Sequence, residues 1–342
     1  MAVFVVLIII SNVLLSAVYY VNKVMLNSNF YQLTYYLFNG KAGSGSFKVV
    51  MDTIITCIPF ALLSIIVTVL PIILVKHFKW FAVKKFIKIY AISLLCFCVL
   101  LTLHSYQFDD YVINKSKKTD IYKYYKDTNK VNVSFKGKKR NLILIYLESV
   151  ESSLMSKENG GLFNKSRIPE LETLALENNN FSNTNKLGGG KNLTVSSFTM
   201  ASLVASSSGT PLDIKIFGGY NEKNKIMPEV KTLGDILKEN GYNLKVIQGT
   251  DINFSATDQY YKIHGDYEIV DYNEMIKKSY VPKGYLEWWG IEDKKMFEIS
   301  KKEILETAKK GVPFAVTMYT MDTHFKDGYL DEDCMNKYET NL

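Results

Sequence analysis

Acidic residues are almost absent from the first third of this 342-residue chain. Residues 1–105 contain 8 Lys and a single acid, Asp52, whereas residues 106–342 carry 33 basic and 33 acidic side chains. The net charge of +7 therefore arises entirely in the first third. Proteins that bind nucleic acid concentrate basic side chains on the folded domain that contacts phosphate. The charge distribution thus argues against DNA or RNA as a partner.

Cysteine is scarce, since the chain has only 4, and this excludes a small disulfide scaffold. Cys57, Cys96 and Cys98 lie in apolar stretches, where cysteine acts as a small hydrophobic residue. Only Cys334 lies in the polar remainder. An odd cysteine in an oxidising compartment raises the question of a partner elsewhere.

Three stretches, 1–21, 53–75 and 89–108, contain no charged side chain. Each is about as long as the ~20 residues that a membrane-spanning helix needs. A cleaved signal peptide is the alternative for the first stretch. That stretch has no basic leading region and no small-x-small cleavage site, and two more apolar stretches follow it. The sequence therefore predicts a membrane anchor of three transmembrane helices over residues 1–105.

The connection between the second and third stretches is rich in lysine. Short loops rich in Lys or Arg stay in the cytoplasm, so we expect a multi-pass protein of the plasma or inner membrane whose C-terminal domain is extracytoplasmic. The first connection, 22–51, is rich in Tyr and Phe and suits an interfacial segment on the outer face; a re-entrant substrate-binding role is the alternative. The lysines of the second connection are Lys76, Lys79, Lys84, Lys85 and Lys88.

Residues 106–140 form a polar basic stretch, with 10 basic residues against 4 Asp. One interpretation is a solvated stalk. The other is a tether whose Lys and Tyr side chains lie at anionic headgroups, where each Lys contributes about 1 kcal/mol. The composition does not decide between them.

Residues 141–342 alternate between strand and helix patterns. The apolar run 141–147 is typical of a strand buried on both faces of a parallel sheet. Alternating strands and helices indicate a layered α/β sheet. The further helices are expected at 169–178, 229–240 and 289–310, and the further strands at 244–248 and 313–319.

Polar residues follow the predicted strands, where an open parallel sheet binds its ligand. Glu148 follows the first strand, Gln248 and Asp251 the middle one, and His324 comes shortly after the last. A lone acid after a strand is more often a cap or a surface residue than a functional one. These positions are therefore candidates rather than assignments.

A glycine-rich loop beginning at Gly188 runs into a short helix with Thr199 near its N-terminus, where free amides and the helix dipole favour a phosphate. A Thr hydroxyl becomes a nucleophile when a base or a metal assists it. Glu148 is a suitable oxygen ligand for Mn²⁺ or Mg²⁺. The alternative is that Thr199 and its hydroxyl-bearing neighbours Thr194, Ser196 and Ser197 only cap the helix.

Seven motifs occur in an order that resembles the phosphoglycerol transferases, membrane-anchored members of the alkaline phosphatase and sulfatase superfamily. The type I enzymes are nearer than the lipoteichoic acid synthases. The resemblance covers residues 140–342 in motif detail, the anchor only in architecture, and implies an alkaline phosphatase/sulfatase-like α/β catalytic domain over 141–342. The motifs are Tyr146-Leu-Glu-Ser-Val-Glu151, the run 198–212, the run 232–242, Gln248-Gly, His264-Gly, Trp289-Gly and Asp322-Thr-His324.

The resemblance implies a role for each matching residue. Thr199 would be the catalytic nucleophile and would also touch the metal, Glu148 would be a metal ligand, and His324 would bind the substrate. Glu151 is the competing acid and is expected behind the metal site or at the surface. His264 and Trp289 are expected to pack only.

One departure from the family concerns the metal site. The family completes that site with an Asp-His pair after a later strand, and no such pair follows His324. We expect the C-terminal part of the domain to be missing from this chain, which would also leave room for a partner of Cys334. The formylglycine motif of sulfatases is absent around Thr199.

The resemblance implies a two-step transfer that needs a divalent metal, Mn²⁺ ahead of Mg²⁺. Phosphoglycerol would pass from phosphatidylglycerol to Thr199, releasing diacylglycerol, and then to an envelope glycan or teichoic-type polymer. One alternative is a phosphoethanolamine transferase or another hydrolase of the superfamily. An alternative of another class is a non-catalytic, envelope-binding pseudoenzyme.

Overall fold

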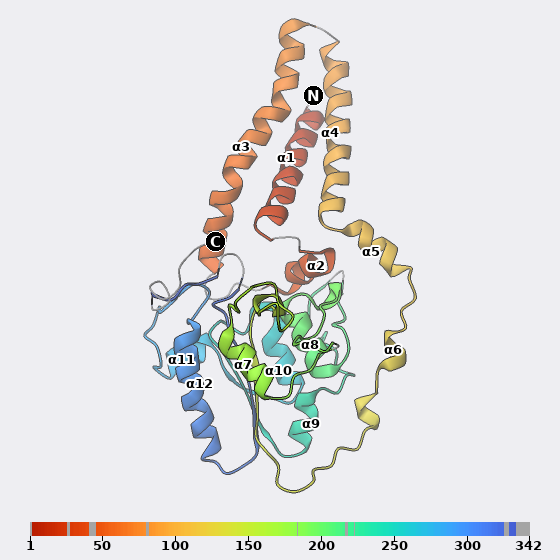
Figure 1. Cartoon of the computed structure of the whole chain (residues 1–342). Coiled ribbons are helices and arrows are strands. Elements are labelled where there is room, and N and C mark those ends of the chain that lie inside the picture. Colours follow the sequence, from red (N-terminus) through yellow and green to blue (C-terminus); the bar gives the residue numbers. More distant parts are fainter. Residues whose placement is uncertain are drawn as a thin grey trace. The chain divides into compact units, whose positions relative to one another are not determined.

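The computed structural model describes residues 2–25, 28–40, 46–79, 82–182, 184–215, 218–221, 223–324 and 328–332. The chain divides into two compact units (Figure 1). Unit 1 comprises residues 1–126 and 213–224, and unit 2 comprises residues 127–212 and 225–342. The chain therefore leaves unit 2 after residue 212, contributes a short segment to unit 1, and returns.

Unit 1 contains three helices that are long and apolar enough to cross a membrane, as judged by length and composition within the described residues. They confirm the predicted apolar helices of the anchor. The third begins earlier than the predicted 89 because its first turns carry lysines, so an uncharged run marks the apolar centre of a helix and not its ends. The helices are α1 (Ala2–Lys23), α3 (Ser46–Phe78) and α4 (Val83–Ser105), which form one bundle in Figure 1.

Polar side chains buried inside this bundle fix how its helices pack. The Asn12 side chain on α1 donates to the Thr68 hydroxyl on α3 (3.0 Å) and accepts from the Ser64 hydroxyl (2.8 Å). Tyr90 on α4 donates to the carbonyl of Thr68 (2.9 Å). In an apolar surrounding such hydrogen bonds join helices, because an unpaired polar group there is unfavourable. The network therefore sets the alignment of α1, α3 and α4.

Helix α2 (Phe30–Asn39) lies in the first connection and is amphipathic. Asn29 caps it by accepting from the backbone amide of Gln32 (2.9 Å). Tyr35 on one face is fully buried, whereas Leu37 on the other is 77% exposed. An amphipathic helix with aromatic residues is the form expected of the predicted interfacial segment.

The stretch predicted as a stalk is partly helical. Helix α5 (Phe108–Lys115) packs on α2 through Phe30 and Tyr111, whose ring centroids are 4.9 Å apart. After the single turn of α6 (Ile121–Tyr124), the Thr128 hydroxyl donates to the carbonyl of Lys231 within unit 2 (2.7 Å). Both ends of the stretch are thus held by packing that its polar composition did not reveal.

The segment 213–224 docks on α2 within unit 1. The buried amide of Tyr220 donates to the side-chain carbonyl of Asn39 (2.7 Å). A Cβ added to Gly219 would lie 2.3 Å from the carbonyl oxygen of Phe38, so the two backbones are in direct contact there. The segment comes a few residues after α8 (Thr199–Ser208) in the chain, but it belongs to unit 1.

Replacing Asn39 by Ala is expected to loosen this segment, because the buried amide of Tyr220 loses its acceptor, at a cost of about 1–3 kcal/mol. Trypsin should then cut after Lys215 or Lys223 about tenfold faster, since 1.4 kcal/mol is a factor of about ten in an opening equilibrium. Gln32→Ala, on the same helix, is the control and should leave the cleavage rate unchanged. Equal cleavage rates for all three proteins would contradict the docking.

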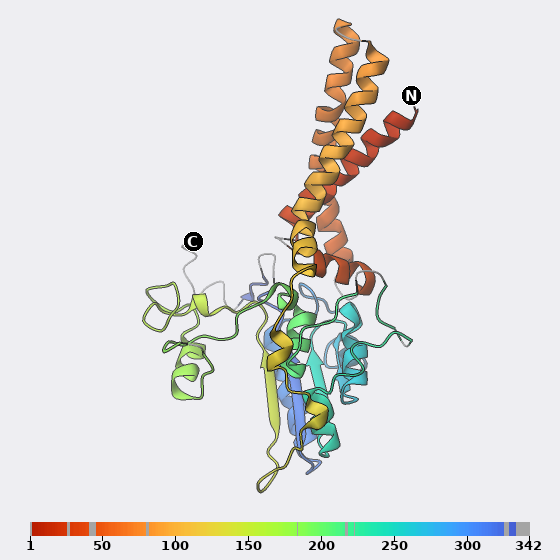
Figure 2. The ribbon, with the colours of Figure 1, turned by 90° about the vertical axis from the view of Figure 1, so that its right-hand side faces the viewer.

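Within the described residues, unit 2 is built on a four-stranded sheet in the order β1-β4-β2-β3, with every strand parallel to its neighbours. Tyr146 at the end of β1 and Gln248 at the end of β2 both pair with Tyr319 at the end of β4, so three carboxyl ends meet at one edge. This confirms the predicted α/β class. The strands are β1 (Leu142–Tyr146), β2 (Asn243–Gln248), β3 (Glu268–Val270) and β4 (Phe314–Tyr319), seen side by side in Figure 2.

Two predicted helices are shorter than expected. A capping box between Thr232 and Asp235 starts α9 after Thr232 rather than at 229. Glu287 and Gly290 form an isolated bridge, so α12 starts at Asp293 and not at 289. With α8, the described α-helices of unit 2 are α7 (Pro169–Glu177), α9 (Leu233–Glu239), α10 (Thr257–Ile263), α11 (Tyr272–Lys277) and α12 (Asp293–Ala308).

The main core lies between the strands β2 to β4 and the helices α11 and α12, with Val316, Ile247 and Met275 fully buried. The prediction that the first strand is buried on both faces is wrong. Ile143 and Ile145 on β1 are 46% and 47% exposed. β1 is an edge strand of the described sheet, and the described residues cover only one of its faces. An unbroken apolar run therefore identified the strand but not its surroundings.

Candidate active site

Glu148 lies in the turn that follows β1, at the edge where the strands end. Its backbone amide donates to the hydroxyl of Thr320 (2.8 Å), and its carbonyl accepts from the hydroxyl of Thr323. The next residue, Ser149, has a φ of 52°, a left-handed conformation that only a tight turn favours. These contacts join the turn after β1 to the turn after β4 and hold the backbone of Glu148 in place.

Thr199 is the first residue of α8. Met200 and Val204 on the inner face of this helix are buried, as the sequence predicts, and they leave Thr199 on the exposed side. The N-cap, Phe198, has no side-chain group that can accept from the first amides. An exposed hydroxyl at an N-terminus with a favourable dipole is a suitable position for attack on a phosphate.

The structure brings Thr199 and Glu148 together, although 51 positions separate them in the chain. The Thr199 hydroxyl donates to Oε2 of Glu148 over 3.3 Å. The other carboxylate oxygen accepts from the Ser149 hydroxyl (3.2 Å). A hydroxyl held by a carboxylate in this way is oriented for deprotonation.

His324 follows β4, in the turn whose Thr323 contacts Glu148. Its imidazole packs on Trp289, with ring centroids 5.0 Å apart. Trp289 was expected only to pack at a helix start, but it lies before the helix and contacts a proposed substrate-binding residue. The sequence motif Trp289-Gly therefore marks a residue beside His324, and not only a residue that packs in the core.

A pair of aspartates pins the turn that carries His324. Asp322 accepts from the amide of Asp293 at the start of α12 (2.9 Å), and Asp293 accepts from the amides of Met321 (2.6 Å) and Asp322 (3.1 Å). Burial raises the pKa of Asp322 to about 7, and the neighbouring charge of Asp293 acts in the same direction. The reciprocal capping holds the end of β4 against α12.

Two glycines of the family motifs hold the site edge together by direct backbone contact. A Cβ added to Gly290 would lie 2.0 Å from the carbonyl oxygen of Gly249, and the amide of Ile291 donates to that carbonyl (2.9 Å). The motifs Gln248-Gly and Trp289-Gly are therefore two halves of one contact. It places Trp289 beside the end of β2.

The change Gly290→Ala is expected to destabilise unit 2 by about 1–3 kcal/mol or more, because backbone and not a flexible side chain must move. Thermal unfolding followed by circular dichroism measures the effect. Gly189→Ala is the matched control, since a Cβ at Gly189 meets nothing within 4 Å. A melting temperature that is the same in both variants would contradict the close contact.

The remaining candidates lie outside this pair. Gln248 donates to the Thr250 hydroxyl (3.1 Å), and Asp251 accepts from Asn253 in a local turn (2.9 Å). Glu151 is exposed and accepts from the Ser153 hydroxyl (2.8 Å). Cys334 lies outside the described residues.

His264 is a packing residue by its contacts. Its Nδ1 lies 3.1 Å from Asp235, and its Nε2 lies 3.0 Å from the carbonyl oxygen of Ile226. The side chain is 3% exposed. Both ring nitrogens thus have partners, and the imidazole joins α10 to α9.

The chain belongs to the sulfatase family, because the family model described as sulfatase matches residues 140–341. Among curated relatives, phosphoglycerol transferase I of Escherichia coli O6:K15:H31 (strain 536 / UPEC) is 31% identical over 219 residues, which are 64% of this chain and 27% of the relative. The phosphoglycerol transferase I of Shigella boydii serotype 18 (strain CDC 3083-94 / BS512) has the same identity and coverage. The chain therefore spans about a quarter of the length of these relatives.

A solved structure of a protein in the alkaline phosphatase superfamily from Vibrio parahaemolyticus aligns with a TM-score of 0.39 at 20% identity. The alignment covers 58% of this chain and 45% of that one. The family match confirms the superfamily to which the sequence motifs point.

Members of the sulfatase superfamily typically use a divalent metal, so the donor set must be compared with that need. The carboxylate of Glu148 and the hydroxyl of Thr199 are the oxygen donors that Mn²⁺ and Mg²⁺ accept, and they lie 3.3 Å apart. No group of three or more His, Cys, Asp or Glu side chains converges in the part of the chain that the structure describes. Glu148 and Thr199 thus fit part of a metal site, and the described residues do not complete it.

Proposed function

We propose that this protein is a metal-dependent phosphotransferase that moves phosphoglycerol from phosphatidylglycerol to an envelope glycan or teichoic-type polymer. The observation that carries the proposal is the hydrogen bond from the Thr199 hydroxyl to Glu148 at the N-terminus of α8 (3.3 Å). The similarity to phosphoglycerol transferase I supports the choice of transferred group. Three membrane-capable helices in the same chain support a lipid donor.

In the first step, Oγ of Thr199 forms a bond to phosphorus while the bond from phosphorus to the diacylglycerol oxygen breaks. Glu148 accepts the hydrogen bond of the hydroxyl and orients it. The proton that Thr199 loses leaves with diacylglycerol. In the second step, the oxygen of an acceptor hydroxyl forms a bond to phosphorus while the bond from phosphorus to Oγ of Thr199 breaks, and the proton of the acceptor hydroxyl passes to Thr199.

The remaining groups stabilise the negative charge of the transferred phosphoryl group. His324 is proposed to bind the phosphoglycerol group and to orient or protonate its oxygens. Free amides at the start of α8 stabilise negative charge on the phosphoryl oxygens. A divalent cation, Mn²⁺ ahead of Mg²⁺, held by Glu148, Thr199 and further ligands would polarise the phosphoryl group and acidify the hydroxyl.

The proposed arrangement suits a substrate that stays in the bilayer. Residues 1–105 would be the membrane anchor, 106–140 the stalk, and 141–342 an extracytoplasmic catalytic domain. The lysine-rich connection after α3 supports this orientation, because such loops remain in the cytoplasm. The lipid headgroup could then reach Thr199 without leaving the membrane.

The proposal is tested with the protein in vesicles that contain phosphatidylglycerol or phosphatidylethanolamine, by measuring diacylglycerol release. Phosphatidylglycerol should be turned over, EDTA should stop turnover, and added Mn²⁺ should restore it. Equal turnover of phosphatidylethanolamine would favour the phosphoethanolamine transferase. Absence of metal-dependent turnover with either lipid would favour a non-catalytic envelope-binding protein.

Glu148→Gln is expected to lower turnover by about 10²–10³-fold, because an amide orients the hydroxyl less well and binds a cation weakly. Glu151→Gln is the matched control, since this exposed acid lies three positions further along the chain and accepts from the Ser153 hydroxyl (2.8 Å). Diacylglycerol release by the two variants decides between these acids. A similar loss of turnover in both variants would contradict the assignment of Glu148 as the acid that holds Thr199.

A further inference from the structure

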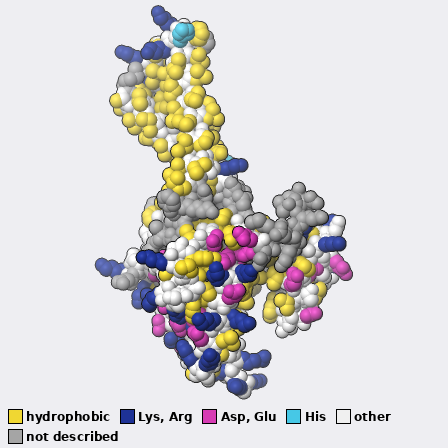
Figure 3. Space-filling model, turned by 90° about the vertical axis from the view of Figure 1, so that its left-hand side faces the viewer, with side chains coloured by type: hydrophobic (Ala, Val, Ile, Leu, Met, Phe, Trp, Pro, Cys, Tyr) yellow, Lys and Arg dark blue, Asp and Glu magenta, His cyan; other side chains and the backbone are white. Residues whose placement is uncertain are grey.

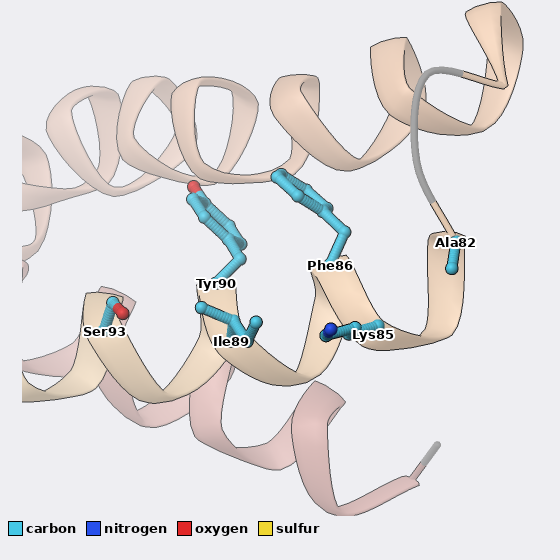
Figure 4. Close-up of a pocket in the computed structure, with 6 residues that line it drawn as sticks. All are labelled: Ala82, Lys85, Phe86, Ile89, Tyr90 and Ser93. Atoms are coloured by element: carbon cyan, nitrogen blue, oxygen red, sulfur yellow. The ribbon is translucent and has the colours of Figure 1, made fainter.

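A groove runs along one face of α4 at the lysine-rich end of the helix bundle. It has a volume of about 490 Å³, within the range of about 300–1,000 Å³ of ligand sites. Its lining residues recur every three or four positions, so they share one side of the helix. They are Ala82, Lys85, Phe86, Ile89, Tyr90 and Ser93 (Figure 4).

The aromatic wall of the groove is held in place. The rings of Phe86 and Tyr90 are stacked, with centroids 5.6 Å apart and an interplanar angle of 8°. Both rings point toward α3 in Figure 4, and the Tyr90 hydroxyl donates to the carbonyl of Thr68 on that helix (2.9 Å). The wall is therefore a fixed apolar surface between two membrane-capable helices.

Charge around the groove has one sign. Between Asp52 and Asp109 the sequence has no acidic residue, whereas five lysines lie near the connection of α3 and α4. Figure 3 shows Lys and Arg side chains gathered at the end of a bundle that is otherwise hydrophobic. Of these five lysines, Lys85 lines the groove, so one end of an apolar slot carries a positive charge.

We propose that this groove binds an anionic phospholipid, with an acyl chain along Ile89 and Ser93 and the headgroup phosphate at Lys85. The apolar part of the groove matches an acyl chain, and Lys85 at its end matches the phosphate of the headgroup. Basic pockets between membrane helices bind anionic headgroups. A zwitterionic lipid fits the apolar part equally well but gains less from the lysines. The site is independent of the proposed phosphotransfer at Thr199.

The experiment uses phosphatidic acid with a diazirine on one acyl chain, in phosphatidylcholine nanodiscs that contain the whole chain. Phosphatidic acid has no glycerol headgroup, so it is not a donor for the proposed reaction. Photolysis should attach the label to peptides that cover residues 82–93. Phosphatidylcholine with the same diazirine chain should label these peptides several-fold less.

Matched variants separate a site from general attraction. Lys85→Gln should lower labelling about fivefold, whereas Lys84→Gln, which lies at the same end but does not line the groove, should change it less than about twofold. Ser93→Trp fills the apolar slot and should also lower labelling. Equal labelling by the two lipids, or equal losses in the Lys84 and Lys85 variants, would overturn the proposal.

Discussion

Replacing Thr199 by Ala is expected to lower diacylglycerol release from phosphatidylglycerol by about 10³-fold or more, because the step that forms the covalent intermediate loses its nucleophile. Unit 2 should still fold. Thr199 lies on the exposed side of α8, where its hydroxyl donates to Glu148 and supports no buried packing. Turnover in vesicles and thermal unfolding of the same preparation separate loss of chemistry from loss of fold.

Two further variants sharpen this expectation. Thr199→Ser keeps a hydroxyl and should retain part of the activity, since the extra methyl group is not needed for attack. Ser202→Ala removes a hydroxyl on the next turn of the same helix, one that already donates to the carbonyl of Ser196 (2.6 Å). That variant should keep normal turnover. Full activity of Thr199→Ala would contradict the nucleophile assignment.

The second large effect is expected at Glu303, a carboxylate of α12 that is 1% exposed. It accepts from Lys245 on β2 (2.5 Å), from Lys278 (2.7 Å) and from the Tyr280 hydroxyl (2.7 Å). Lys245 is itself 4% exposed, so removing Glu303 takes away its buried partner and leaves the ammonium with Glu268, a half-exposed carboxylate 3.2 Å away. Glu303→Ala is therefore expected to lower the free energy of unfolding by about 3–5 kcal/mol.

The same network predicts a pH dependence. Burial alone would raise the pKa of Glu303, but hydrogen bonds from Lys245, Lys278 and Tyr280 outweigh it and lower the pKa from 4.5 to about 2. A carboxyl whose pKa is lowered by folding stabilises the folded state above its unfolded pKa. That contribution is lost as the pH falls from about 4.5 toward 2.

Thermal unfolding measured between neutral pH and pH 3 tests both the loss of stability in Glu303→Ala and the predicted dependence of stability on pH. Glu306→Ala is the control on the same helix, because Glu306 is exposed, and it should change stability by less than about 0.5 kcal/mol. The Glu303 variant should lose stability less steeply with acid than the unchanged protein. Identical acid profiles would show that the ionised carboxylate contributes nothing there.

The sequence was sufficient to predict the fold class, because each signal was local. Uncharged runs identified the apolar helices, and alternating patterns identified β1, β2 and β4 of the parallel sheet. These two inferences needed only neighbouring residues and general topology. The resemblance to the phosphoglycerol transferases, and not the strand pattern, assigned Glu148 and Thr199 to one site, and the structure places their side chains 3.3 Å apart.

The parts that were missed depend on contacts between distant segments. The exposure of β1 depends on its place in the sheet order, which its own apolar run does not encode. The contact of Gly249 with Gly290 and the docking of Tyr220 on Asn39 join residues far apart in the chain. A buried Lys245 inside a strand pattern gave a signal, because a lysine there requires a buried acid.

If Thr199 carries the transferred group, a single turnover should leave the label on this residue. The protein is mixed with phosphatidylglycerol labelled in its headgroup glycerol, quenched with acid, digested and mapped by mass spectrometry. Phosphoglycerol is expected on the peptide that contains Thr199, and no labelled peptide is expected with Thr199→Ala. Diacylglycerol release with the label on another residue, or with no labelled residue at all, would contradict it.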